Sequence, residues 1–250
     1  MLGESHYDIA LLQEAHLPSN GWELSSYSRG ADVVKLSERA EVRNLARIPQ
    51  GRPPTRDEIS VSAPGTVAAA HVLPRGGEPF VAVSVYARWE RPHPRTRTNW
   101  RVGYADAMAH RAISDLSTFI GYPDLTVHRI LVAGDFNLFH GALDSNRLAL
   151  PARDRSVFDR LEALGLQFIG PRYPHGRKAN PAPSGLPADS ENVPTYYTSR
   201  QRPESAANQL DYVFASHGFH ESVSARALNS PEEWGPSDQC RIAIDIDLSR

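Results

Sequence analysis

Short apolar runs that each stop at a polar group recur along the chain and predict buried strands. The clearest is Ile130–Ala133, an apolar and β-branched run followed by Gly134, as expected of an interior strand that ends in a tight turn. The run from Tyr7 stops in the same way at Glu14. Alternation of apolar and polar positions predicts other strands. These lie at 59–62, 65–72, 80–86, 211–216 and 241–248, the first three forming an antiparallel meander.

Helical spacing of apolar residues predicts two helices. Residues 103–120 form the first, with Gly121 as the stop, and the second runs from Asp154 as N-cap to Gly165. Three other stretches show turn-forming or proline-rich composition without a period. They predict a surface hairpin at 21–31, a loop or irregular edge at 38–58 and a long loop at 170–194.

Length and composition favour one globular unit. A chain of 250 residues with 40% hydrophobic residues can bury one large core, and it shows neither repeats nor a linker, so we expect a single domain over 1–250. The net charge of -2 gives no general attraction to nucleic acid or anionic membranes. The lone Cys240 excludes an internal disulfide and a cysteine-based zinc cluster. With no membrane span or signal peptide in the pattern, we expect a monomeric, cytoplasmic protein.

Polar side chains at the strand ends are the candidate chemistry. Asp135 and Asn137 follow the central strand, where they either bind a cation or a phosphate ester or simply form an Asx-rich turn. Glu14 follows its strand, whereas Asp211 and Asp238 precede theirs. Strands of opposite direction would bring these acids to one rim, where a divalent cation would offset the repulsion between like charges.

The most basic segment, 88–101, follows the strand that ends at Tyr86. Its prolines exclude a continuous helix, and arginine interleaved with tryptophan suits a phosphodiester backbone with unstacked bases. The candidate substrate contacts are Arg88, Arg95, Arg97 and Trp100. A solvated loop with tryptophans packed on the protein is the alternative explanation.

Five motifs occur in an order and at separations that resemble the endonuclease/exonuclease/phosphatase family. They are Leu-Gln-Glu at 12–14, Val-Tyr at 85–86, Gly-Asp-Phe-Asn at 134–137, Leu-Asp-Tyr-Val-Phe at 210–214 and Ser-Asp at 237–238. The resemblance extends from residue 7 to residue 248. It implies an α/β fold, a DNase I-like four-layer α/β/β/α sandwich of two mixed sheets. It also implies metal-dependent cleavage of phosphate esters, in substrates from nucleic acids to lipid head groups.

The resemblance also implies a role for each motif residue. Glu14 would bind Mg²⁺ or Mn²⁺, and Tyr86 would donate a hydrogen bond to the phosphate. Asp135 would orient or deprotonate the attacking water, while Asn137 would hold the scissile phosphate near it. This division suits phosphate-ester hydrolysis, because a cation and hydrogen-bond donors stabilise charge on phosphoryl oxygens.

The C-terminal motif departs from the family pattern. Asp238 would belong to the same polar centre and to the metal site, and Asp211 would normally orient a catalytic histidine at position 239. This chain has Gln239 there. A carboxamide can donate a hydrogen bond, but it cannot exchange a proton near neutral pH. Gln239 is therefore expected to limit catalysis.

A second departure is at the N-terminus, where the family has a central strand with a metal-site asparagine. The sequence starts too late to contain that strand, so we expect either a truncated start or another segment in its place. Two functions follow from the resemblance. One is a metal-dependent hydrolase of phosphate esters, a phosphodiesterase or nuclease, and the other is a non-catalytic module of the same fold that binds phosphate ligands or nucleic acid. A serine or thiol hydrolase is disfavoured, because no Gly-x-Ser-x-Gly motif is present.

Overall fold

A six-stranded mixed sheet is the centre of the protein. The computed structural model describes residues 7–16, 29–96, 104–120, 128–143 and 151–249. The sheet order is β3-β6-β7-β8-β10-β9, and neighbours are antiparallel except for β7 and β8, which are parallel. The strands are β3 (Ala40–Asn44), β6 (Val67–Pro74), β7 (Phe80–Tyr86), β8 (Ile130–Asp135), β10 (Asp211–Ser216) and β9 (Leu166–Gly170).

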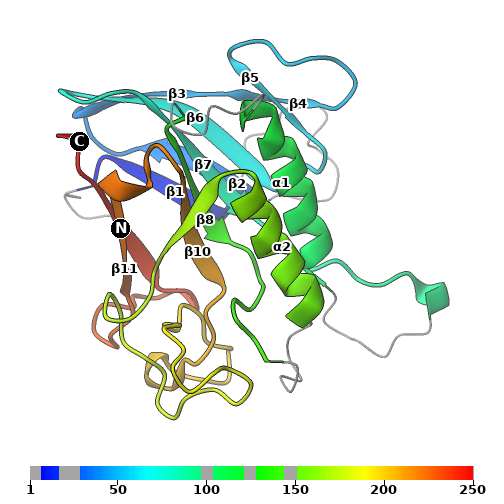
Figure 1. The fold of residues 1–250 in the computed structure, drawn as a ribbon, viewed down its shortest axis with the longest axis vertical. Helices are drawn as coiled ribbons and strands as arrows, with labels where there is room; N and C mark the ends of the chain where they lie inside the picture. The colour runs from blue at the N-terminus through cyan, green and yellow to red at the C-terminus, as the bar shows by residue number, and fades with distance from the viewer. Residues whose placement is uncertain (1–6, 17–28, 97–103, 121–127, 144–150, 250) are drawn as a thin grey trace.

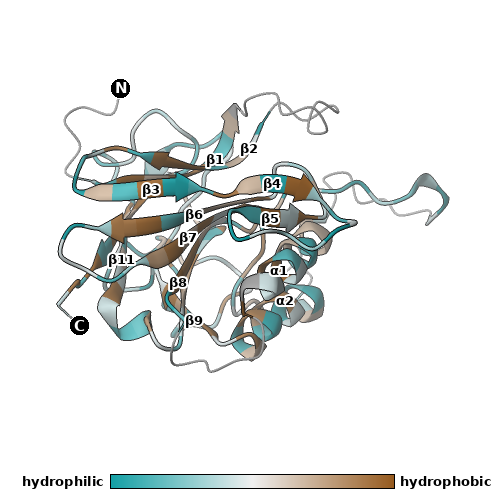
Figure 2. Cartoon of the chain, turned by 90° about the horizontal axis from the view of Figure 1, so that it is seen from above, coloured by the Kyte–Doolittle hydropathy of each residue, from teal (hydrophilic) through white to brown (hydrophobic). Residues whose placement is uncertain are grey.

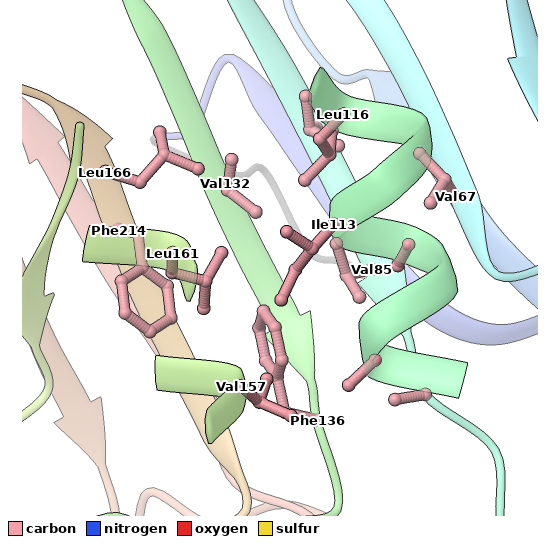
Figure 3. Close-up of a cluster of buried hydrophobic side chains, with 14 of the residues drawn as sticks. Val67, Val85, Ile113, Leu116, Val132, Phe136, Val157, Leu161, Leu166 and Phe214 are labelled. Atoms are coloured by element: carbon pink, nitrogen blue, oxygen red, sulfur yellow. The ribbon is translucent and has the colours of Figure 1, made fainter. Parts of the chain in front are cut away.

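Two helices cover one face of this sheet. Figure 1 shows α1 (Asp106–Ile120) and α2 (Pro151–Ala163) side by side against the strands. Figure 3 shows the shared core, in which Ile113 of α1 and Leu161 of α2 face Val132 of β8. All three side chains are fully buried. Because burial of apolar area is the main driving force of folding, this layer holds β8 firmly.

Two antiparallel ribbons cover the opposite face. One pairs β1 (Ile9–His16) with β2 (Arg29–Lys35), and the other pairs β11 (Val223–Leu228) with β12 (Arg241–Ile246). Apolar residues of both ribbons pack on the same face of the sheet, over residues of β8 and β10. The predicted α/β sandwich is thus confirmed. Within the described residues, β1 and β12 each have one strand neighbour and do not pair with each other.

The remaining elements are short. A parallel pair, β4 (Ala46–Pro49) with β5 (Glu58–Val61), lies beside α1 in Figure 2. The 3-10 turns are η2 (Pro94–Thr96), η3 (Pro203–Ser205) and η4 (His220–Ser222). Among the helices of the described ranges, none has the length and apolar character needed to cross a bilayer. Residues 171–202 form no regular helix or strand, as predicted for the long loop at 170–194.

Three predictions about elements are wrong. Of the two alternatives for 38–58, a loop or an irregular edge, the loop is wrong: the segment contains β3, which pairs with β6 at the edge of the sheet, together with β4 and the start of β5. Backbone pairing of this kind overrides a charged and aperiodic sequence. Within the predicted meander, β5 pairs with β4 rather than with β6.

The start of the second helix also differs from the prediction. The helix α2 begins at Pro151, three positions before the expected N-cap at Asp154. Proline at the first helical position is common, because its missing N–H would have no partner there. Asp154 is instead buried, and its carboxylate accepts a hydrogen bond from the Phe139 N–H at 3.2 Å. Asp154 therefore ties the chain that follows β8 to α2.

A candidate active site at the strand ends

The ends of β7, β8 and β10 meet at one edge of the sheet. The strand register pairs Asp135 with Tyr86 on one side and with Asp211 on the other. β7 and β8 finish at this edge, whereas β10 starts there. Opposite strand directions therefore bring these three side chains together, as the sequence predicts.

Gly134 allows the close approach of β8 to β7. A Cβ atom at this position would lie 1.9 Å from the Val85 carbonyl oxygen, which no side chain could tolerate. The strand continues through Gly134 to Asp135, so the predicted turn at this glycine is wrong. Because Gly134 has no Cβ atom, β8 can pack closely against β7, and Asp135 lies directly beside Tyr86.

Three donors surround the Asp135 carboxylate. Its Oδ1 accepts the Asn137 backbone N–H at 2.9 Å, and its Oδ2 accepts Asn137 Nδ2 at 2.7 Å and Gln239 Nε2 at 3.1 Å. Asn137 Nδ2 also donates to the Ala87 carbonyl oxygen at 3.1 Å. Asn137 has a positive φ of 52°, and strained backbone of this kind concentrates at functional sites. In this structure Asn137 positions Asp135, and its predicted role in holding the phosphate stays a prediction.

Burial dominates the protonation of Asp135. The side chain is 1% exposed, and burial raises its pKa to about 7, although the hydrogen bonds from Gln239 and Asn137 lower it. The negative charge of Glu14 raises this pKa further. A carboxyl group that exchanges a proton near neutral pH suits general base catalysis. A nearby divalent cation would favour the ionised form.

Asp211 is a buried acid with an incomplete set of partners. It is 5% exposed, and within the described part of the chain its Oδ2 atom has no hydrogen-bond partner. Burial raises the pKa of Asp211 well above its usual value, and the charge of Asp135 raises it further, while the Thr195 side chain lowers it. Burial therefore disfavours the ionised form of Asp211 in the absence of a cation.

A bulge in β1 turns Glu14 toward Tyr86. The register with β2 shifts between Leu12 and Ala15, and Glu14 has a φ of 54°. The Tyr86 hydroxyl donates to Glu14 Oε1 at 2.8 Å. Burial raises the pKa of Tyr86, and Glu14 raises it further, so Tyr86 remains a donor. On the outer side, Arg29 Nη1 lies 3.7 Å from Glu14 Oε2.

Two partly buried contacts hold this bulge. Gln13 Nε2 donates to Ser84 Oγ at 3.0 Å, and Ser84 Oγ donates to the Leu12 carbonyl oxygen at 2.7 Å. Ser84 belongs to β7, two residues before Tyr86. The conformation of Glu14 is therefore linked to the strand that carries Tyr86. The sequence motif at 12–14 includes Gln13 without a role for it, and no sequence feature singled out Ser84 or Arg29.

Asp238 lies at the exposed margin of this group. The Tyr197 backbone N–H donates to the Asp238 carbonyl oxygen at 3.0 Å, and Tyr196 forms an isolated bridge with Gln239. The pKa of Tyr196 is raised, mainly by burial and also by Asp238, Asp135 and Glu14. Tyr196 is therefore near the acidic group, although no sequence motif marked it. We define the polar cluster as Glu14, Tyr86, Asp135, Asn137, Asp211, Asp238 and Gln239.

Among the predicted substrate contacts, Arg88 lies close enough to the polar cluster for its charge to lower the pKa of Tyr86, against the stronger effects that raise it. Arg88 is half-buried and donates to the Pro64 carbonyl oxygen at 2.9 Å. Arg95 is exposed on η2, which extends away from the body of the protein in Figure 1. Arg97 and Trp100 lie outside the described residues. Binding of substrate by this segment stays a prediction.

The donor chemistry of the polar cluster fits a hard cation. The described residues contain no group of three or more His, Cys, Asp or Glu side chains arranged around a metal position. Glu14 is half-exposed, however, and its Oε2 atom faces outward toward a cationic side chain. Mg²⁺ is commonly held by one or two carboxylates together with water and phosphate oxygens. The Oε2 atom of Glu14 is therefore a chemically suitable oxygen ligand for a hard cation, and the metal-binding roles of Glu14 and Asp238 stay predictions.

Comparison with known proteins supports this description of the fold. A model of the Endonuclease/Exonuclease/phosphatase family matches residues 1–238. An AP endonuclease from Archaeoglobus fulgidus is 15% identical with a TM-score of 0.59, over 98% of this chain and 91% of that one. The 3' phosphatase NExo (D146N) from Neisseria, bound to a product DNA hairpin, is 15% identical with a TM-score of 0.57, over 98% of this chain and 91% of that one.

A third structure is also similar. AP endonuclease LMAP from Leishmania major is 16% identical with a TM-score of 0.56, over 96% of this chain and 71% of that one. Comparison with curated protein sequences gives no significant match. At these identities the three structures establish the fold.

Proposed function

Because the chain belongs to the endonuclease/exonuclease/phosphatase family, we propose that it is a divalent-metal-dependent phosphodiesterase that acts on nucleic acid. The observation that carries the proposal is the set of contacts in which Asn137 and Gln239 hold Asp135 beside Tyr86 and Glu14. The similar structures, an AP endonuclease and a 3' phosphatase bound to a DNA hairpin, support nucleic acid as the substrate class.

In this mechanism Asp135 is the general base. Asn137 fixes the orientation of its carboxylate through two hydrogen bonds, and a pKa of about 7 allows it to take a proton from water near neutral pH. Tyr86 stays protonated, and its hydroxyl, which donates to Glu14 Oε1 in this structure, would turn to donate its hydrogen bond to a phosphoryl oxygen. Mg²⁺ or Mn²⁺ held at Glu14 and Asp238 would stabilise the negative charge that develops on the phosphate.

Gln239 limits the rate of this mechanism. Its amide can donate a hydrogen bond to phosphate, but it supplies neither a positive charge nor a transferable proton. This residue is also the observation that favours the second candidate function, a binding module without turnover. Incubation with a phosphodiester and magnesium, with and without a chelator, separates the two. Magnesium-dependent cleavage supports the enzyme, whereas binding without cleavage supports the module.

Substitution of Glu14 tests the metal site. We expect Glu14→Gln to weaken Mg²⁺ or Mn²⁺ binding about tenfold or more, because the neutral amide loses the charge that attracts a hard cation. Calorimetric titration of both proteins measures this. Glu41→Gln is a suitable control, since Glu41 is also half-exposed beside an arginine, at 2.7 Å from Arg43. Equal metal affinity in the Glu14→Gln protein and the wild type would remove Glu14 from the site.

The basic segment after β7 is proposed to bind the phosphate backbone. Replacing Arg95 and Arg97 with alanine is expected to weaken oligonucleotide binding and to lower the slope of log affinity against log salt by about 1–2, because fewer counterions are released. Fluorescence anisotropy between low and moderate salt measures the slope. An unchanged slope would show that this segment is solvated and does not contact the substrate.

A further inference from the structure

The strongest unassigned feature beside the polar cluster is the guanidinium of Arg29. This residue begins β2 and pairs with His16 across the ribbon, next to the bulge that turns Glu14. Its Nη1 atom lies 3.7 Å from Glu14 Oε2, and the two side chains are 59% and 51% exposed. The distance exceeds that of a direct N–H···O hydrogen bond. Arg29 therefore lies within ion-pair distance of Glu14 without a direct hydrogen bond to it.

The two oxygens of Glu14 have different partners. Tyr86 donates to Oε1 at 2.8 Å, whereas Oε2 faces Arg29. The Tyr86 contact is made by a partly buried strand residue, while the Arg29 contact is made by a solvated side chain. An exposed ion pair of this kind is worth little free energy, so it opens easily. Oε2 is therefore the oxygen that Glu14 can offer to another cation.

We propose that Arg29 pairs with Glu14 in the cation-free protein and binds a substrate phosphate once a divalent cation occupies Glu14. This inference rests on the proposed function. A divalent cation and a guanidinium at the same carboxylate oxygen repel each other. With a cation bound, Arg29 would leave Oε2, and its long side chain would keep the planar guanidinium beside the polar cluster, where it suits bidentate binding of phosphate oxygens.

The proposal predicts opposite effects of one substitution on two ligands. Arg29→Gln removes the positive charge that competes for Glu14, so Mn²⁺ should bind about two- to tenfold more tightly without substrate. The same variant should bind a phosphorothioate dinucleotide about tenfold more weakly in the presence of Mn²⁺, because the phosphate contact is lost. In the absence of metal, the dinucleotide should bind both proteins equally.

Calorimetric titration of the intact protein measures all three affinities. Arg39→Gln is the matched control, because Arg39 is 58% exposed and lies 2.7 Å from Asp8 at the other end of the same ribbon. It should change none of the affinities. Arg29→Lys, which retains the charge without the fork, should keep the wild-type Mn²⁺ affinity and lose part of the dinucleotide affinity.

The outcomes separate this proposal from the proposed function. If the wild type binds Mn²⁺ but Arg29→Gln binds it equally or more weakly, competition at Glu14 is excluded and the proposal is overturned. An unchanged dinucleotide affinity in the presence of Mn²⁺ would also overturn it. If the wild type itself binds no Mn²⁺, the metal-dependent function fails, and the phosphate role of Arg29 fails with it.

Discussion

Replacing Gln239 with histidine is expected to raise phosphodiesterase activity ~10²–10⁴-fold, the usual contribution of a positioned general acid or base. Gln239 Nε2 already lies 3.1 Å from Asp135 Oδ2, so the side chain at this position reaches the polar cluster. An imidazole there can carry a positive charge toward phosphate near neutral pH. Its other N–H can bind Asp211, whose Oδ2 lacks a partner among the described residues.

Turnover of a phosphodiester with magnesium, measured across pH, tests this expectation. The pH profile of the histidine variant should show the titration of the imidazole in addition to that of Asp135. Gln50→His is a matched control, because Gln50 also donates to a buried aspartate, Asp115, at 3.4 Å, on the helix side of the sheet. A folded Gln239→His protein with no gain in rate would leave the binding module as the better account.

Asp211→Asn is expected to stabilise the wild type at pH 8 by ~1–3 kcal/mol, because it removes a buried carboxyl group that must otherwise stay protonated or ionise without a full set of partners. The pKa of Asp211 is raised in the folded protein, so its folded state binds a proton more strongly than its unfolded state. Its contribution to stability is therefore present below about pH 4 and is lost as pH rises through the folded pKa. Near pH 4 the variant should show no gain.

Denaturant unfolding in chelator at pH 4 and pH 8 measures this difference. Asp245→Asn, at an exposed position of β12, is the control and should change stability little at either pH. In the Gln239→His protein the same Asp211→Asn change should instead reduce the gained activity, because the imidazole loses its acceptor. Lower stability of Asp211→Asn at pH 8 would mean that Asp211 is ionised and paired, contrary to our description.

The interior of the fold could be predicted from sequence because its signals are local. The apolar patterns of β8 and α1 can be recognised within each segment without knowing which strand or helix lies next to it, and both elements occur where expected. β3 could not be predicted, since it is a charged edge strand whose hydrogen bonds come from β6, about thirty residues away in sequence. Composition predicts a loop or an irregular edge at 38–58, because composition does not report pairing with a distant strand.

The polar cluster could be predicted in part for the same reason. Asp135 and Asp211 stand at the ends of clearly periodic strands, so strand direction alone places them at one edge. The contacts of Arg29 and Tyr196 could not be predicted, because they depend on a bulge in β1 and on bridges between loops. Neither feature has a sequence signal that we recognised. That Asp211 Oδ2 lacks a hydrogen-bond partner among the described residues could be learned only from the structure. The sequence predicted only that Asp211 has no histidine to orient, because position 239 is glutamine.

The most direct test of the central claim is magnesium-dependent cleavage of a phosphodiester by the wild type, Asp135→Asn and Asp115→Asn, with each rate expressed per folded protein. Asp115 is the matched control, because it is also buried and accepts hydrogen bonds from Ser62, but it belongs to α1. We predict that the wild type cleaves only with magnesium, that Asp135→Asn lowers the rate at least ~10²-fold, and that Asp115→Asn keeps it. Cleavage by Asp135→Asn at the wild-type rate, or no cleavage by the wild type, would contradict a phosphodiesterase site at the end of β8.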